Sequence, residues 1–123
     1  MILEHASQLI SRFSEYDAAG FELHHSQKQD APSGTSKILQ GTLSKYFPNS
    51  CQKEFSAIRC GNIIGTHNIL FNSSFDTITL GHEAHSRQGF AEGALLAGEW
   101  LKKRAGFFTF EDMLAALYRG ESQ

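Results

Sequence analysis

The sequence contains few cysteines and no long apolar segment. Its two cysteines, Cys51 and Cys60, form no CxxC pair, and this spacing favours reduced structural thiols over a disulfide. No apolar run approaches the roughly 20 residues needed to cross a bilayer, so we predict no contact with a membrane. Met1 leads directly into an amphipathic pattern instead of a basic segment followed by an apolar one. We therefore expect a cytoplasmic protein.

The sequence also lacks an excess of charge of one sign. Eleven Lys and Arg residues against thirteen Asp and Glu residues give a net charge of −2, and this balance argues against a nucleic-acid partner. The hydrophobic content of 41% is ordinary for a soluble globular protein. A chain of 123 residues is long enough for one core but not for two. We therefore expect a single domain over residues 1–123.

The spacing of apolar residues predicts four helices and four strands. The helices are expected over residues 2–17 with Gly20 near the C-cap, from Ser33 to Phe47, from Gln88 onward, and from Thr109, where Asp112 completes a capping box. The strands are expected at residues 21–24, 55–59, 67–72 and 75–83, the last two forming a hairpin across Asn72–Ser74. This order predicts an α+β fold. Its single, mainly four-stranded mixed sheet would carry helices on one face and leave the other face available for oligomerisation.

One stretch, residues 22–35, has the properties of an anion site. Pro32 fixes its own φ and pushes Ala31 toward an extended conformation, so a helix can begin only after it. Ser33 is then a natural N-cap, and Gly34 lets backbone N–H groups approach a ligand closely. Free N–H groups at the positive end of a helix dipole attract an anion. The corner formed by Ser33, Gly34 and Thr35 is therefore predicted to bind negative charge.

Cationic and titratable side chains precede this corner. Lys28 would add a full positive charge, and His24 or His25 can move a proton near neutral pH. Adjacent residues on a strand point to opposite faces, so only one histidine would face the site unless the strand ends between them. Together these residues predict a site for an anionic substrate that must be protonated.

Each of these residues also has a structural interpretation. Lys28 alone would be an ordinary surface lysine, and the corner at residues 33–35 would be an N-cap that binds only water. Asp30 would either cap the following helix or hold Lys28, and we favour such a structural role for it. The combination of the cations with the corner is what favours a functional site.

Three further histidines raise the question of a metal site. His82 and His85 are three residues apart on a predicted strand, so their side chains point to opposite faces, which is poor geometry for chelation. His67 lies on another predicted strand, and no Cys, Asp or Glu at ligand spacing completes a set with these histidines. We therefore predict no metal site.

Residues 22–35 resemble the signature of the dihydrodipicolinate reductase family, now called 4-hydroxy-tetrahydrodipicolinate reductases. The family pattern E-x-H-x-x-x-K-x-D-x-P-S-G-T-A is matched from Glu22 to Thr35, and Ser36 replaces the alanine. A second block agrees at Gly65-Thr66-His67, where the family has Gly-Glu-His, and from His82 to Ala94. The resemblance extends over essentially the whole chain but over only the second half of the family's protein. No GxGxxG or GxxGxxG motif occurs in these 123 residues.

The resemblance implies roles for the site residues. His24 matches the family's proton donor or acceptor, and Lys28 matches its second acid. Four further residues match positions that hold the carboxylates of the substrate: His25, Ser33, Gly34 and Thr35. The family reduces a cyclic imine dicarboxylate on the path to diaminopimelate and lysine. Its hydride donor is NADPH or NADH, bound by an N-terminal Rossmann domain.

The resemblance also implies an assembly. Family members form homotetramers through the sheet of this domain, which suits the open face predicted above. We expect residues 1–123 to be the substrate-binding and tetramerisation domain, and we expect the isolated domain to be inactive because it lacks a nicotinamide site. The alternative is a non-catalytic module that binds anions or forms oligomers.

Overall fold

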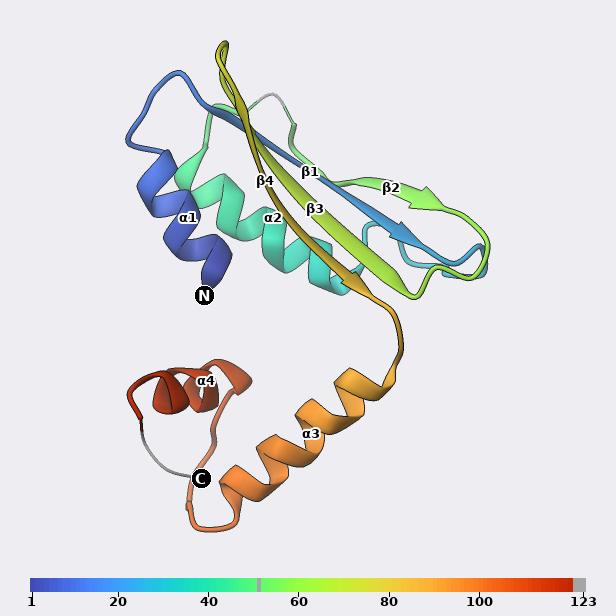
Figure 1. Cartoon of the computed structure of the whole chain (residues 1–123), viewed down its shortest axis with the longest axis vertical. Coiled ribbons are helices and arrows are strands. Elements are labelled where there is room, and N and C mark those ends of the chain that lie inside the picture. Colours follow the sequence, from blue (N-terminus) through green and yellow to red (C-terminus); the bar gives the residue numbers. More distant parts are fainter. Residues whose placement is uncertain (51, 121–123) are drawn as a thin grey trace. The chain divides into compact units, whose positions relative to one another are not determined.

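The computed structural model describes residues 1–50 and 52–120 and divides the chain into two compact units (Figure 1). The first unit, Met1–His85, contains helices α1 and α2 and a four-stranded sheet. The second unit begins at Ser86 and contains helices α3 and α4. Each unit has its own apolar core. The expectation of a single substrate-binding and tetramerisation domain over residues 1–123 stays a prediction.

The sheet is mixed. Its strands are β1 (Asp17–His24), β2 (Ser56–Arg59), β3 (Gly65–Asn72) and β4 (Thr77–Ala84). They lie side by side in the order β2-β1-β3-β4, and β1 pairs with β2 in parallel and with β3 antiparallel. β3 and β4 form the predicted antiparallel hairpin. The prediction of an α+β fold with one four-stranded mixed sheet is confirmed.

Helices α1 (Ile2–Ile10) and α2 (Gly34–Tyr46) lie on the same side of this sheet (Figure 1). Burial alternates along β1, and the residues at even positions from 18 to 24 are buried. The core between helices and sheet consists of Leu3, Ile10, Ala18, Leu43, Phe47, Phe55, Ile69 and Phe71. The opposite face carries half-buried or exposed apolar side chains: Ala19, Phe21, Leu23, Ile58 and Leu70.

The helix-covered face changes from apolar to polar along β1. Near the start of the strand Ala18 is opposite Phe71, and both side chains are buried in the core. Four residues later Glu22 is opposite His67 on the same face. Because side chains on one face recur every second residue, the strand that anchors the core at one end delivers polar groups at the other.

The boundary between α1 and β1 is the main correction to the sequence prediction. The first helix ends at Ile10 instead of near residue 17, and β1 begins at Asp17 instead of at Phe21. Gly20 is not a helix cap but a buried residue in the middle of β1. A Cβ atom built on Gly20 would lie 2.2 Å from Cζ of Phe55, so the ring of Phe55 occupies the space of the missing side chain.

The predicted helix starts are confirmed elsewhere. Ser33 is the N-cap of α2, and Thr109 and Asp112 form the capping box of α4 (Phe110–Tyr118). Helix α3 spans Gln88–Leu101, as the periodicity predicts. In the second unit, Trp100, Met113 and Ala116 form the buried cluster.

None of the described helices is both long and apolar enough to cross a membrane. Of the two cysteines, Cys60 is an exposed free thiol, and Cys51 lies outside the described residues.

Candidate functional site

The predicted site lies where β1 ends. His24 is the last residue of the strand, and its carbonyl oxygen accepts a hydrogen bond of 2.9 Å from the Cys60 N–H after β2. The chain then crosses from β1 to α2 through residues 25–33, and the Ala31–Pro32 peptide bond in this segment is cis. The strand end, the connecting loop and the N-terminus of α2 therefore meet at one edge of the first unit.

Two backbone N–H groups at the start of α2, those of Gly34 and Thr35, are available as hydrogen-bond donors. The Ser36 N–H donates to Oγ of Ser33 at 3.2 Å, which is the capping bond, and the Ser33 N–H donates to Glu22. Gly34 and Thr35 are exposed, and within the described chain their N–H groups have no acceptor. The first turn of a helix has no intrahelical acceptor for these donors. They are the groups that an anion would meet.

Glu22 lies at the centre of the site and contacts residues from several elements. Its side chain is fully buried. Its two carboxylate oxygens accept from the Ser33 N–H (3.1 Å to each), from Oγ of Ser36 (2.5 Å) and from Nη2 of Arg59 (2.9 Å). Burial raises the pKa of Glu22, but the hydrogen bonds from Ser33, Ser36 and Arg59 outweigh it and lower the pKa to about 2. The carboxylate is therefore ionised at neutral pH.

Two imidazoles face this carboxylate. Nδ1 of His24 and Nε2 of His67 each lie 3.7 Å from Oε2 of Glu22. The two rings make an edge-to-face contact with centroids 5.2 Å apart. Burial lowers the pKa of His24, and the charge of Glu22 opposes this effect. Burial and then the neighbouring His24 lower the pKa of His67, so both rings are neutral at pH 7.

Lys28 and His25 lie in the loop beside these groups. Nζ of Lys28 contacts Oδ1 of Asp30 at 2.6 Å, so Asp30 holds Lys28, while the cap of α2 is Ser33. The carbonyl oxygen of Asp30 accepts a bond of 2.7 Å from Nη2 of Arg59. His25 is half-buried just beyond the end of β1. The structure thus brings Lys28, His24 and the corner to one region of the fold.

Some site residues were not recognised from the sequence alone. Sequence patterns do not identify Ser36 or Arg59 as site residues, and they identify Glu22 and His67 only as parts of the two motif blocks. The strand register places Glu22 opposite His67 on β3 and His24 opposite Arg59 on β2. Their separation in sequence hides this convergence. The sequence contains one signal for part of this arrangement. Alternate residues of a strand share a face, so a strand that ends at His24 places Glu22 and His24 on the same face, as the burial pattern of β1 shows.

The same groups include three side chains with atoms that metals bind. One ligand atom from each of Glu22, His24 and His67 lies within 4.8 Å of the others. However, four contacts from protein donors already occupy the Glu22 carboxylate, and one of them comes from the cation Arg59. A metal ion would have to displace these donors and approach a guanidinium group. We therefore derive no metal site here, and the expectation of none stays a prediction.

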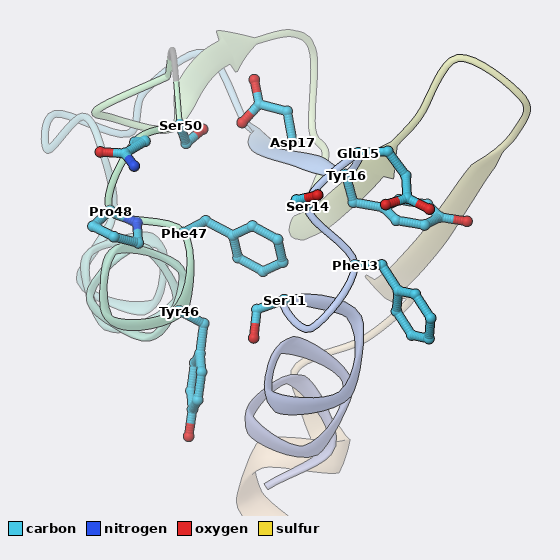
Figure 2. A pocket seen from close by; sticks show the side chains of 11 residues that line it. Ser11, Phe13, Ser14, Glu15, Tyr16, Asp17, Tyr46, Phe47, Pro48 and Ser50 are labelled. Atoms are coloured by element: carbon cyan, nitrogen blue, oxygen red, sulfur yellow. The ribbon is translucent and has the colours of Figure 1, made fainter.

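A separate hollow of about 340 Å³ lies at the opposite end of β1 (Figure 2). It is lined by residues 11 and 13–17 between α1 and β1 and by residues 46–50 at the end of α2. Asp17 begins β1 and His24 ends it, so the length of the strand, about 23 Å, separates this hollow from the candidate site. The hollow is not part of the site.

Comparison with known proteins identifies relatives of this chain. The chain matches the family described as "Dihydrodipicolinate reductase, C-terminus" over residues 1–114. It is 37% identical over 114 residues to the 4-hydroxy-tetrahydrodipicolinate reductase of Thermosipho africanus, covering 92% of this chain and 48% of that protein. It is 39% identical to the reductase of Methanoregula boonei, covering 81% of this chain and 45% of that protein.

A solved structure is also similar. The dipicolinate-bound dihydrodipicolinate reductase from Paenisporosarcina sp. TG-14 aligns with a TM-score of 0.60 and 26% identity, covering 76% of this chain and 42% of that one. This chain spans about half the length of the relatives it matches. With the signature from Glu22 to Thr35 folded into one corner, the chain belongs to the dihydrodipicolinate reductase C-terminal family.

Proposed function

We propose that this chain is the substrate-binding half of a 4-hydroxy-tetrahydrodipicolinate reductase, an NAD(P)H-dependent enzyme of lysine and diaminopimelate biosynthesis. The observation that carries the proposal is the pair of N–H groups of Gly34 and Thr35, which have no acceptor in the described chain. They follow Ser33, whose Oγ lies 3.3 Å from Nε2 of His67, the ring that contacts His24. A dicarboxylate needs such donors and a cation. Family membership supplies the reaction class.

In this proposal the residues divide into two groups. Gly34 and Thr35 donate their N–H groups to a substrate carboxylate, and His25 and Ser33 complete its surroundings. Hydride addition to an unsaturated ring leaves a centre that must take a proton, and His24 supplies it with Lys28 as the second acid. Burial lowers the pKa of His24 in the free chain, but a bound dianion would raise it. The substrate would thus promote protonation of its own acid.

The residues of this chain do not fit a dinucleotide. A parallel β1–α2–β2 unit would carry a dinucleotide fingerprint in the loop between β1 and α2. That loop, residues 25–33, contains no glycine, and Pro32 precedes the helix. We therefore propose that NADPH or NADH binds outside residues 1–123, and we assign no hydride-transfer role to these residues.

Calorimetry with pyridine-2,6-dicarboxylate tests the binding role of the corner. Gly34→Pro removes one N–H donor, and proline is well tolerated at the first position of a helix when the preceding residue is extended, as Ser33 is. Gly34→Ala keeps the N–H and places its Cβ where no atom of the described residues lies within 4 Å. We expect Gly34→Pro to weaken binding about 10- to 100-fold relative to Gly34→Ala, the effect of a hydrogen bond to a charged group.

The proposal fails if the unaltered chain does not bind the dicarboxylate. Equal affinities of the two Gly34 variants for the dicarboxylate would show that the N–H group at position 34 does not bind it. Binding without any dependence on His25 or Thr35, tested by alanine substitution, would favour a non-catalytic anion-binding module.

We further propose that the chain forms a homotetramer through the sheet face opposite α1 and α2. Apolar side chains on that face support this, and Ile58 among them is 46% exposed. Sedimentation velocity should show a tetramer that Ile58→Glu dissociates. A monomeric unaltered chain would contradict the proposal.

A further inference from the structure

We propose that Glu22 is a positioning residue of this site: its carboxylate holds His24 in the tautomer with hydrogen on Nδ1 and so presents Nε2 to the substrate. The inference rests on the proposed function, because it concerns the group assigned to supply the proton. It assigns a task to a buried charge that the proposed reaction does not otherwise use. Glu22 touches no substrate atom in this scheme, so it acts through His24.

The environment of the two ring nitrogens differs. Nδ1 of His24 is sealed from solvent and has no hydrogen-bond partner among the described residues, and Oε2 of Glu22 lies 3.7 Å from it. At this separation a nitrogen lone pair on Nδ1 would be repelled by the carboxylate, whereas an N–H group there is attracted to it. The hydrogen therefore lies on Nδ1 and points toward the carboxylate. A separation of 3.7 Å is too long for a hydrogen bond, but such contacts often tighten when a substrate binds.

Nε2 is left to exchange a proton. This nitrogen has no hydrogen-bond partner within the described chain, and it lies 3.2 Å from the position that a Cβ atom on Gly65 would occupy. Since Gly65 has no side chain, the space beside Nε2 stays open. The pairing of His24 with Arg59 on β2 also holds the end of β1 in place, and the imidazole of His24 projects from this end.

The carboxylate itself cannot turn away. Its four contacts come from three directions: the start of α2 at Ser33, the first turn at Ser36, and β2 at Arg59. A carboxylate held by these donors has one orientation, so Oε2 stays directed at the imidazoles. The same oxygen faces Nε2 of His67, which also lies 3.3 Å from Oγ of Ser33. One fixed oxygen thus orients two rings.

The other charged and titratable groups near His24 do not provide an alternative anchor. Those that act on His24 or His67 from the surrounding elements are Lys28 and Asp30 in the loop, Arg59 on β2 and His82 on β4. Lys28 and Arg59 are cations and cannot accept a hydrogen bond from Nδ1. The carboxylate of Asp30 is exposed and paired with Lys28. Glu22 is the acceptor directed at Nδ1.

Long-range ¹H–¹⁵N spectra of the 123-residue chain with labelled histidine test this inference, because they distinguish the two neutral tautomers. At pH 8 we expect His24, assigned by its loss in His24→Asn, to have hydrogen on Nδ1. In Glu22→Gln, Arg59 keeps the amide oxygen at the Oε1 position, so the amide NH₂ faces Nδ1 and favours hydrogen on Nε2. The ratio of the two tautomers should fall about tenfold or more.

Ser36→Ala is the matched control. It removes one donor from the same carboxylate but leaves the charge, so His24 should keep its tautomer. Hydrogen on Nε2 in the unaltered chain would overturn the inference, and this readout decides the matter even if Glu22→Gln does not fold. Addition of pyridine-2,6-dicarboxylate to the same sample separates the two ideas. If the chain binds the dicarboxylate but His24 carries its hydrogen on Nε2, only the inference about Glu22 is overturned. If His24 carries its hydrogen on Nδ1 but the dicarboxylate does not bind, the proposed function is overturned.

Discussion

The ionised carboxylate of Glu22 predicts a specific dependence of stability on pH. Its pKa is about 2 in the folded chain against an ordinary value of 4.5. Because the folded pKa is the lower one, Glu22 contributes stability that is fully present above pH 4.5 and is lost as the pH falls through about 2. The first unit should therefore lose stability in acid, and the perturbation that tests this is Glu22→Gln.

The magnitude follows from the pKa difference. The interval from 4.5 to about 2 corresponds to about 3 kcal/mol of unfolding free energy at about 1.36 kcal/mol for each pKa unit. The side chain is fully buried, so solvent screening requires no reduction of this figure. His24 and His67 act in the same direction at higher pH, because burial lowers their pKa values and the unfolded chain takes up protons first below about 6.5.

Urea unfolding between pH 7 and pH 2.5, followed through the amide signals of β1 and β3, measures this dependence. Glu22→Gln should be about 3–5 kcal/mol less stable at pH 7, because it leaves the charge of Arg59 without its partner. The unfolding free energy of this variant should also lack the decline below pH 4.5 that Glu22 causes in the unaltered chain. Glu54→Gln changes an exposed carboxylate of the same unit and should stay within about 0.5 kcal/mol of the unaltered chain at pH 7. A loss below about 1 kcal/mol between pH 5 and pH 2.5 in the unaltered chain would refute the reasoning.

Three further changes have defined outcomes. Gly20→Ala would place a Cβ atom 2.2 Å from the ring of Phe55, and we expect thermal melts to show about 1–3 kcal/mol of destabilisation. Gly65→Ala places a Cβ atom 3.2 Å from Nε2 of His24, so dicarboxylate affinity measured by calorimetry should fall with little change in melting temperature. Dicarboxylate binding should tighten as the pH falls from 8 to 6, because burial lowers the pKa of His24 and the dianion raises it; constant affinity across this range would contradict proton uptake.

Much of the fold follows from local patterns. The caps at Ser33 and Thr109 and the hairpin between β3 and β4 depend on residues a few positions apart, and each was predicted correctly. The end of α1 was predicted wrongly, because small residues near Gly20 are typical both of a helix end and of a strand packed closely against a neighbour. The ring of Phe55 decides between the two, and it comes from a distant segment.

The site was predictable only in part, for the same reason. Lys28 and the corner at residues 33–35 form a cluster in the sequence, so local reasoning was enough to place them in one site. Arg59 and His67 reach Glu22 through two different strand pairings, which no short motif encodes. The buried half of the site is therefore a property of the sheet register, and the exposed half is a property of the loop.

The charges around the corner explain how an anion site tolerates a buried carboxylate. Arg59 neutralises Glu22 and at the same time holds the carbonyl oxygen of Asp30, so the pair adds little net charge and ties the loop to the sheet. Lys28 is likewise paired with Asp30. A ligand carboxylate that binds Lys28 must therefore replace Asp30, an exchange of one exposed ion pair for another that yields little net free energy. The larger gain comes from the amide donors at Gly34 and Thr35, which have no partner to displace among the described residues, so in the proposed site the corner supplies most of the affinity.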